Sequence, residues 1–323
     1  MKIIIFVLLL ALLFACTENH HASRKAELKM INLSQKFSNK KLEISGMDWY
    51  GDSLFFLNQI PSKFNNSIYF TTRQEIQASI SNQDSLFFNT FLFSQEGVAE
   101  KIGKIPDYEA IAFNGDSVYL LIEVENPMRS FIIQGVIDSI GLALLPESLT
   151  EIPIQKGLYE IACEALFIKG DRIYVFYEAN GANINNNPKV FCFDLSLNRM
   201  ESLAFENIEY RITDATRIQA DNSIWVINHF WTGEMDLLKP AEERLVPSTF
   251  ENNKDGVNRL IQLELKGDRI IIKDDHPLML PPKFWNWEAL TLFDKNTFLI
   301  VNDEYSAPPN RTGLGYIKIS HNE

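Results

Sequence analysis

Acidic and amide side chains recur along this chain at one fixed spacing. Five short segments each carry a polar reference residue, and a second polar residue follows fourteen positions later. The reference residues are Ser45, Glu109, Glu164, Asp214 and Glu288, and their partners are Gln59, Glu123, Glu178, Asn228 and Asn302. Oxygen ligands of these types suit calcium, which accepts about six to eight of them. All members except Ser45 and Gln59 are therefore candidate calcium ligands.

A structural alternative exists for the same side chains. Acids at the starts of strands also accept hydrogen bonds from the backbone of a neighbouring element, which would only hold the fold together. Carboxylates gathered without a cation raise one another's pKa, and this favours the metal interpretation. We favour the pair Glu164 and Glu178 most, because a loop of small and amide residues, 179–183, follows it.

Histidines give little support to zinc or copper, since His229 and His276 do not form a close pair. His229 directly follows Asn228 and is the candidate general base if the site is catalytic. Other side chains of the adjoining loops could bind an anionic group or stack on a sugar or peptide, although charged loops and aromatic packing are common without a ligand. These weaker candidates are Arg129, Lys283, Trp285 and Arg311.

The elements that must position these residues are hairpins. Seven positions after each reference residue comes a turn residue, and a second apolar run follows. The turn residues are Asp52, Asp116, Asp171, Asp221 and Lys295, and the second runs cover 54–57, 118–122, 173–177, 224–227 and 298–301. Runs rich in Val, Ile, Phe and Tyr and divided by turn residues are typical of β-hairpins. Further runs at 190–195, 260–265, 270–272 and 316–319 supply outer strands.

Repetition of the hairpins predicts a single all-β propeller. They recur about every 50 to 75 residues, an interval that fits four-stranded blades. Five blades are favoured, and six remain possible because the widest intervals could contain a degenerate blade. The last repeat leaves chain for only about three strands, so an N-terminal strand from 28–33 or 40–44 is expected to close the ring. Inner strands then place the reference residues and their partners around one end of a central channel.

Three blade starts share a short motif: Glu43-Ile44-Ser45-Gly46-Met47, Asp107-Tyr108-Glu109-Ala110-Ile111 and Glu164-Ala165-Leu166. These segments resemble the blade starts of the SdiA-regulated family of bacterial envelope propellers. The resemblance covers roughly 40–304, and extends more loosely to phytase-like and esterase-like propellers. It implies a propeller in the cell envelope and specifies the fold better than any activity.

The N-terminus predicts export and lipid anchoring. Lys2 is followed by an apolar run, 3–15, that is too short to span a bilayer and is typical of a signal peptide. Leu13-Phe14-Ala15-Cys16 resembles a lipobox, in which the cysteine becomes lipidated. We therefore expect a signal peptide at 1–15, a lipidated tether at 16–27 and the propeller at 28–323. The protein would be held in the bacterial envelope by its anchor, in either leaflet.

Composition limits the partners. The chain has 42 acidic against 30 basic residues, which argues against nucleic acid as a ligand. Cys163 and Cys192 are expected two strands apart in one sheet, too distant for a disulfide, and thus free and buried. The first functional hypothesis is a calcium-holding protein that binds a small molecule, a glycan or another envelope protein. The alternative is a calcium-dependent hydrolase of phosphoesters or lactone-type esters.

Overall fold

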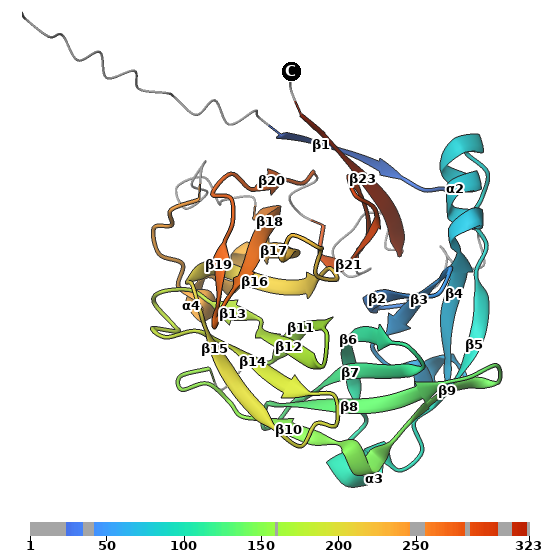
Figure 1. Cartoon of the computed structure of the whole chain (residues 1–323), viewed down its shortest axis with the longest axis horizontal. Coiled ribbons are helices and arrows are strands. Elements are labelled where there is room, and N and C mark those ends of the chain that lie inside the picture. The colour runs from blue at the N-terminus through green and yellow to red at the C-terminus, as the bar shows by residue number, and fades with distance from the viewer. Residues whose placement is uncertain are drawn as a thin grey trace, which may run out of the picture.

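Five antiparallel blades surround one axis in the computed structural model (Figure 1). The structure describes residues 24–34, 42–158, 161–245, 256–281, 285–302 and 312–321. The predicted five-bladed, all-β propeller is confirmed. The five predicted hairpins form the first two strands of each blade, counted from the axis outward.

Blades 1 and 2 belong to one sheet, because their outermost strands, β5 and β9, pair in parallel. From the axis outward, blade 1 contains β2 (Ile44–Tyr50), β3 (Ser53–Asn58), β4 (Ser67–Thr72) and β5 (Asn89–Ser94). Blade 2 contains β6 (Asp107–Asn114), β7 (Ser117–Val124), β8 (Arg129–Ile137) and β9 (Gly141–Leu144), and β10 (Thr150–Ile152) also pairs with β8.

Blades 3 and 4 are joined in the same way through β15 and β19. Blade 3 contains β11 (Cys163–Lys169), β12 (Arg172–Tyr177), β14 (Lys189–Asp194) and β15 (Met200–Phe205). Blade 4 contains β16 (Ile208–Ala215), β17 (Ser223–Phe230), β18 (Val257–Lys266) and β19 (Arg269–Ile272), with the short β13 (Ala179–Asn180) beside β16 and β20 (Leu278–Met279) beside β18. Cys163 and Cys192 lie on the first and third strands of blade 3, free and buried as predicted.

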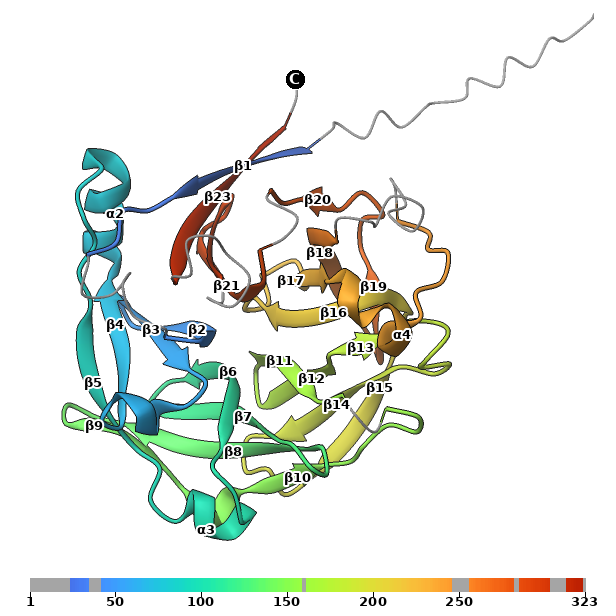
Figure 2. The same cartoon turned by 180° about the vertical axis from the view of Figure 1, so that it is seen from behind.

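Blade 5 closes the ring with both ends of the described chain. It contains β21 (Trp287–Asp294), β22 (Thr297–Asn302), β23 (Gly313–His321) and, outermost, β1 (Arg24–Met30). Figures 1 and 2 show β1 alongside β23. The closing strand begins at Arg24, so the folded part starts before the expected Leu28. In this edge strand only Ala26 and Leu28 pack on the core. The segment therefore has too few apolar residues for its sequence to indicate a strand.

Short helices fill the wide intervals between repeats. The interval after Ser45 holds η1 (Pro61–Phe64), α2 (Arg73–Asn82) and α3 (Val98–Ile102). The interval after Asp214 holds η3 (Thr232–Glu234) and α4 (Met235–Leu238), and η2 (Pro146–Ser148) follows β9. The strands that the structure describes make no sixth blade.

Apolar packing lies between the blades rather than on the axis. Four hydrophobic clusters each join two neighbouring blades, as Phe55 of blade 1 packs with Phe113 of blade 2, and a fifth cluster joins blades 2, 3 and 4. Because both faces of each sheet are covered in this way, the inner strands are held rigidly around the axis. Polar residues at the starts of these strands are thereby brought toward one another.

Candidate functional site

A β-bulge marks the start of every inner strand. One residue there falls out of the pairing with the second strand, and a bulge of this kind re-aims its side chain. The bulged residues are Ser45, Glu109, Glu164, Thr213 and Glu288. The repeat in the sequence thus corresponds to a repeated backbone feature. In blade 4 the bulge falls on Thr213, one position before Asp214, so the repeat is displaced by one residue there.

Two of the bulges fasten neighbouring blades. Ser45 Oγ donates to the carbonyl of Tyr108, 2.5 Å away, and Thr213 Oγ1 donates to that of Trp287 at 2.7 Å. Each acceptor directly precedes the bulged glutamate of the next blade. The two hydroxyl residues therefore link neighbouring blades. The bulged residues of the other three blades are the carboxylic acids Glu109, Glu164 and Glu288.

Asp214 also links two neighbouring blades, blades 4 and 5. Its Oδ1 accepts from the backbone N–H of Ala215 at 2.8 Å, and its Oδ2 accepts from that of Leu290 in blade 5 at 2.6 Å. Burial raises the pKa of Asp214 well above its ordinary value, although these hydrogen bonds oppose the rise. Both oxygens are committed to the backbone, which is the arrangement foreseen in the structural alternative.

The remaining acids gather at one end of the axis, where the inner strands begin. We call this group the acidic end, and it comprises Asp107, Glu109, Glu123, Glu164, Glu178, Glu234 and Glu288. Glu109 is its electrostatic centre. Burial, followed by repulsion from Asp107, Glu123, Glu164 and Glu288, raises its pKa well above the ordinary value. The acidic end thus brings together side chains from blades 2, 3 and 5 and from the loop after β17.

One guanidinium lies within the acidic end. Arg211 of β16 contacts Glu164 through Nη2 at 2.9 Å, Glu234 through Nη1 at 3.2 Å and Glu178 through Nε. Burial acts to lower the pKa of Arg211, but the surrounding carboxylates outweigh burial and raise it. The favoured pair Glu164 and Glu178 is therefore bridged by a cationic side chain instead of facing an open coordination position.

A single guanidinium does not balance the acidic end. Burial and the nearby Glu164 and Asp107 raise the pKa of Glu123 to about 8, and burial and Glu43 raise that of Asp107 to about 6. Glu164 is only 6% exposed, and its Oε2 has no hydrogen-bond partner among the described residues. This buried carboxylate oxygen without a partner, beside Glu109 and Glu123, is the strongest structural indication of a cation site.

Three other predicted residues have structural partners. The amide of Asn228 donates to two backbone carbonyls, and its oxygen accepts from Arg259 Nε at 2.7 Å. Asn302 is buried and pairs with Trp287 across the blade 5 hairpin. His229 Nδ1 lies 2.7 Å from Asn258 Oδ1, and burial lowers the pKa of the histidine to about 4. His229 is therefore neutral at pH 7 and shielded from solvent.

The weaker ligand candidates are dispersed. Arg129 starts β8, the third strand from the axis, and its guanidinium lies over the ring of Phe131 and donates to the carbonyl of Ile102. Trp285 packs edge-on against Trp287 with ring centroids 5.2 Å apart. Lys283, Arg311 and the predicted lipidation site Cys16 lie outside the described residues.

Among the residues that the structure describes, one trio of acidic and histidine side chains brings its ligand atoms close enough together to hold a metal ion, and it lies outside the acidic end. The ligand atoms of Asp274, Asp275 and His276 lie within 4.8 Å of one another. Asp274 already pairs with Arg24, and the other two residues are exposed, so this surface group offers no enclosed site. None of the helices that the structure describes is long and apolar enough to cross a membrane.

Comparison with known proteins supports the fold. No family model matches the chain, and no curated protein matches its sequence. A PQQ-bound aldose sugar dehydrogenase from Streptomyces coelicolor is similar in structure, with a TM-score of 0.50 and 10% identity over 93% of this chain and 99% of that chain. The catalytic domain of a GH62 α-L-arabinofuranosidase from Coprinopsis cinerea has a TM-score of 0.52 and 8% identity over 93% and 98%. At these identities the likeness establishes a shared propeller architecture alone.

Proposed function

We propose that this protein is a lipid-anchored binding propeller of the bacterial envelope that holds a calcium ion at its acidic end. The observation that carries the proposal is the unpartnered Oε2 of the buried Glu164. It lies in a group of carboxylates that greatly outnumbers the one guanidinium among them. We assign the ion to Glu109, Glu123 and Glu164, with Asp107 and Glu288 nearby.

The donor chemistry fits calcium. Every candidate ligand in this group is a carboxylate oxygen, and calcium binds hard oxygen ligands with flexible geometry. Zinc and copper favour nitrogen and sulfur ligands, which the carboxylates of the acidic end do not supply. Arg211 supports the assignment, because it binds Oε1 of Glu164 and so fixes the orientation of Oε2.

The electrostatics support a bound cation as well. In its absence burial and mutual repulsion raise the pKa of Glu109 well above its ordinary value and bring that of Glu123 to about 8, so Glu123 retains a proton near neutral pH. A divalent ion removes this repulsion and stabilises the ionised forms, since opposite charge lowers a carboxylate pKa. Binding only to the native protein then adds stability by mass action.

Anchoring through the N-terminus would leave the acidic end free to bind a partner. Lipidation at Cys16 attaches the protein to a membrane just before β1, on the outer edge of blade 5 and away from the axis. The bound partner would be a small molecule, a glycan or another envelope protein. Membership of the SdiA-regulated family, proposed from the blade starts, is consistent with this location.

Calorimetric titration of calcium tests the proposal. We expect saturable binding to the purified protein, and at least about tenfold weaker binding to the double variant Glu109→Gln/Glu123→Gln because affinity depends on ligand charge. Glu147→Gln, at an exposed position in η2, is the matched control and should bind like the parent. Equal affinity in parent and double variant would place the ion elsewhere, and absence of binding at millimolar calcium would refute the proposal.

A further inference from the structure

An exposed tryptophan lies beside the acidic end. Trp231 directly follows β17, in which every residue is buried, yet Trp231 itself is 63% exposed. A Cβ atom at position 233 would collide with three consecutive carbons of the indole, Cε3, Cζ3 and Cη2, so one face of the ring lies flat on Gly233. The opposite face is therefore turned to solvent. Because residue 233 has no side chain, the ring is held as a flat surface, which we call the tryptophan platform.

A groove of about 640 Å³ adjoins the platform at Gly233. It lies between the loop after β13 and α4, which are joined by a hydrogen bond of 2.9 Å from Asn183 Nδ2 to the carbonyl of Lys239. Asn183 Oδ1 has no partner among the described residues. Asp236 and Lys239 are the only charged residues in the described part of the groove wall, and both are exposed. The groove therefore offers polar groups and no net charge, and Leu237 adds an apolar contact.

One segment contributes to both the platform and the acidic end. Glu234 directly follows Gly233 and binds Arg211 at a distance of 3.2 Å. The same side chain is among the carboxylates that surround Arg211. A molecule on the platform would therefore lie at the rim of the acidic end.

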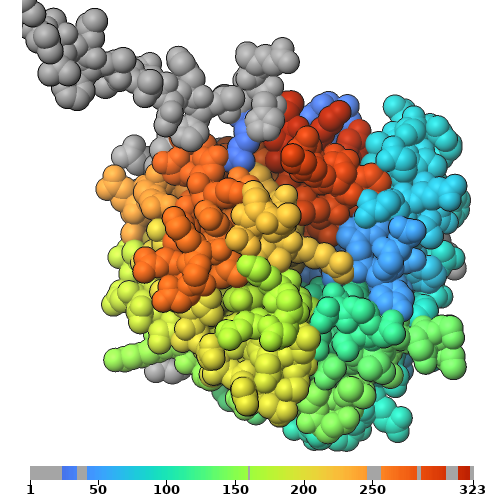
Figure 3. Space-filling view, viewed as in Figure 1, coloured from blue at the N-terminus to red at the C-terminus, as the bar shows by residue number. Residues whose placement is uncertain are grey.

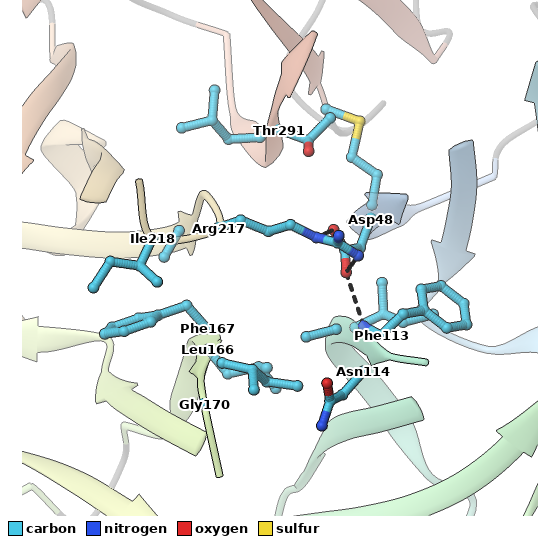
Figure 4. A pocket seen from close by; sticks show the side chains of 15 residues that line it. Asp48, Phe113, Asn114, Leu166, Phe167, Gly170, Arg217, Ile218 and Thr291 are labelled. Atoms are coloured by element: carbon cyan, nitrogen blue, oxygen red, sulfur yellow. Dashed lines mark hydrogen bonds and ion pairs between the residues drawn. The ribbon is translucent and has the colours of Figure 1, made fainter. Parts of the chain in front are cut away.

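The opposite end of the axis is crossed by an ion pair. Arg217, which follows β16 in blade 4, donates from Nε and Nη2 to the two oxygens of Asp48 in blade 1, at 2.7 and 2.8 Å (Figure 4). Blade 5 separates these blades in the ring, so the arginine reaches across the axis. Gold atoms of blade 4 meet blue atoms of blade 1 over the centre of the face in Figure 3. This bridge obstructs the axis, so a partner of the acidic end approaches from the side of the platform.

We propose that the tryptophan platform and its groove bind a neutral glycan, with one sugar ring stacked on Trp231 and further hydroxyls bonded to the polar residues of the groove. A sugar ring fits this surface because its C–H face is apolar, whereas the hydroxyls at its edge both donate and accept hydrogen bonds. Sites of this kind combine aromatic contact with a few placed polar groups. The inference rests on the proposed binding role of the propeller and selects the glycan among its possible partners. It does not require the calcium ion.

Charge favours a neutral glycan over an acidic one. Asp236 and Lys239 cancel within the groove, so a uronate group would find no excess positive charge there. The nearby acidic end would also repel it, because like charges placed together across an interface are strongly unfavourable. The same repulsion disfavours the surface of a membrane that contains anionic lipids.

Titration with oligosaccharides tests the assignment. Cellohexaose, maltohexaose and xylohexaose are neutral and differ in shape, whereas hexagalacturonate carries a carboxylate on every ring. Each is titrated into the purified protein, in EDTA and in calcium, and followed by calorimetry and tryptophan fluorescence. We expect at least one neutral oligosaccharide to bind with millimolar affinity or tighter and to change the emission of Trp231. Hexagalacturonate should bind at least about tenfold more weakly.

Two variants of the platform separate stacking from general effects on the fold. Trp231→Ala should weaken binding about tenfold or more and remove the fluorescence change, and it should fold normally because the side chain is exposed. Gly233→Ala retains the tryptophan but should weaken binding about fivefold, since the added methyl group displaces the stacked ring. Phe87→Ala is the matched control, because Phe87 is 68% exposed in blade 1, and it should bind like the parent.

Several results would overturn the proposal. They are failure of all three neutral oligosaccharides to bind, tighter binding of hexagalacturonate, and equal affinity in the parent and Trp231→Ala. Binding to phosphatidylglycerol vesicles that depends on Trp231 would instead identify a membrane contact and would also overturn it. Glycan binding should persist in EDTA and in Glu109→Gln/Glu123→Gln, so failure of the platform and failure of the calcium site are separate results.

Discussion

Arg211 and Glu164 form an ion pair of 2.9 Å across the boundary between blades 4 and 3. The pair engages one carboxylate oxygen and leaves the other buried without a partner among the described residues. Arg211 therefore partly neutralises the acidic end while preserving a free ligand oxygen. The following experiments test this arrangement and its consequences.

Replacing Arg211 by Met should destabilise the protein strongly. Loss of one partner from a buried ion pair leaves uncompensated charge, and we expect the free energy of unfolding to fall by about 3 kcal/mol at pH 7. Urea denaturation measures this change. Arg172→Met is the control, because Arg172 and Glu201 form an exposed pair whose loss should cost less than about 1 kcal/mol. Equal losses in both variants would contradict a central role for Arg211.

Stability of the calcium-free protein should fall as pH rises. Glu123 and Asp107 have folded-state pKa values of about 8 and about 6, above their ordinary values near 4. Between pH 4 and 8 the native state then holds more protons than the unfolded chain, so the free energy of unfolding decreases with pH in this window. Melting temperatures measured in EDTA should be higher at pH 5 than at pH 8.5. Glu123→Gln cannot ionise and should show a smaller decrease, whereas parallel profiles would exclude Glu123 as a cause.

Calcium binding at pH 7 should release protons. The ion favours ionised carboxylates, so it displaces the proton held by Glu123. The apparent binding enthalpy should therefore differ between buffers of different ionisation enthalpy. The difference should shrink at pH 9, where Glu123 has already lost its proton. A buffer-independent enthalpy at pH 7 would be inconsistent with binding at these protonated carboxylates.

Cys16→Ala should abolish lipidation and move the protein from the membrane fraction to the soluble fraction. Labelling with radioactive palmitate in a bacterial host provides the measurement, because a lipidated cysteine carries the label. Cys163 and Cys192 remain in the variant as buried thiols and serve as internal controls. Label retained by the variant, or unchanged membrane association, would argue against the anchor.

The fold was predictable from the sequence because its hairpins carry apolar runs divided by turn residues. Glu109, Glu123 and Glu164 could be placed at one end of the axis because both strands of a hairpin meet there. The role of Arg211 was harder to predict, since its contacts with Glu178 and Glu234 depend on side-chain packing between β16 and its neighbours. A one-residue displacement in blade 4 likewise hid the equivalence of Thr213 and Ser45.

The ion pair between Asp48 and Arg217 was harder to predict from the sequence. Asp48 is one of two buried polar residues in β2, together with Ser45, and Arg217 follows the reference residue of its repeat by three positions. Nothing in their spacing of 169 residues links them, because the contact crosses the axis between blades that are not adjacent. Long-range pairs of this kind depend on the geometry of the closed ring.

Closure of blade 5 by β1 has a consequence for how the chain folds. Since β1 pairs with β23 along its full length, β1 must wait until β23 has been synthesised before these backbone hydrogen bonds can form. Contacts that join distant parts of a chain slow folding, so completion of the ring should be a late event. Before that event, the edges of β1 and β22 are exposed for pairing with other chains, and truncation of β23 would make this hazard permanent.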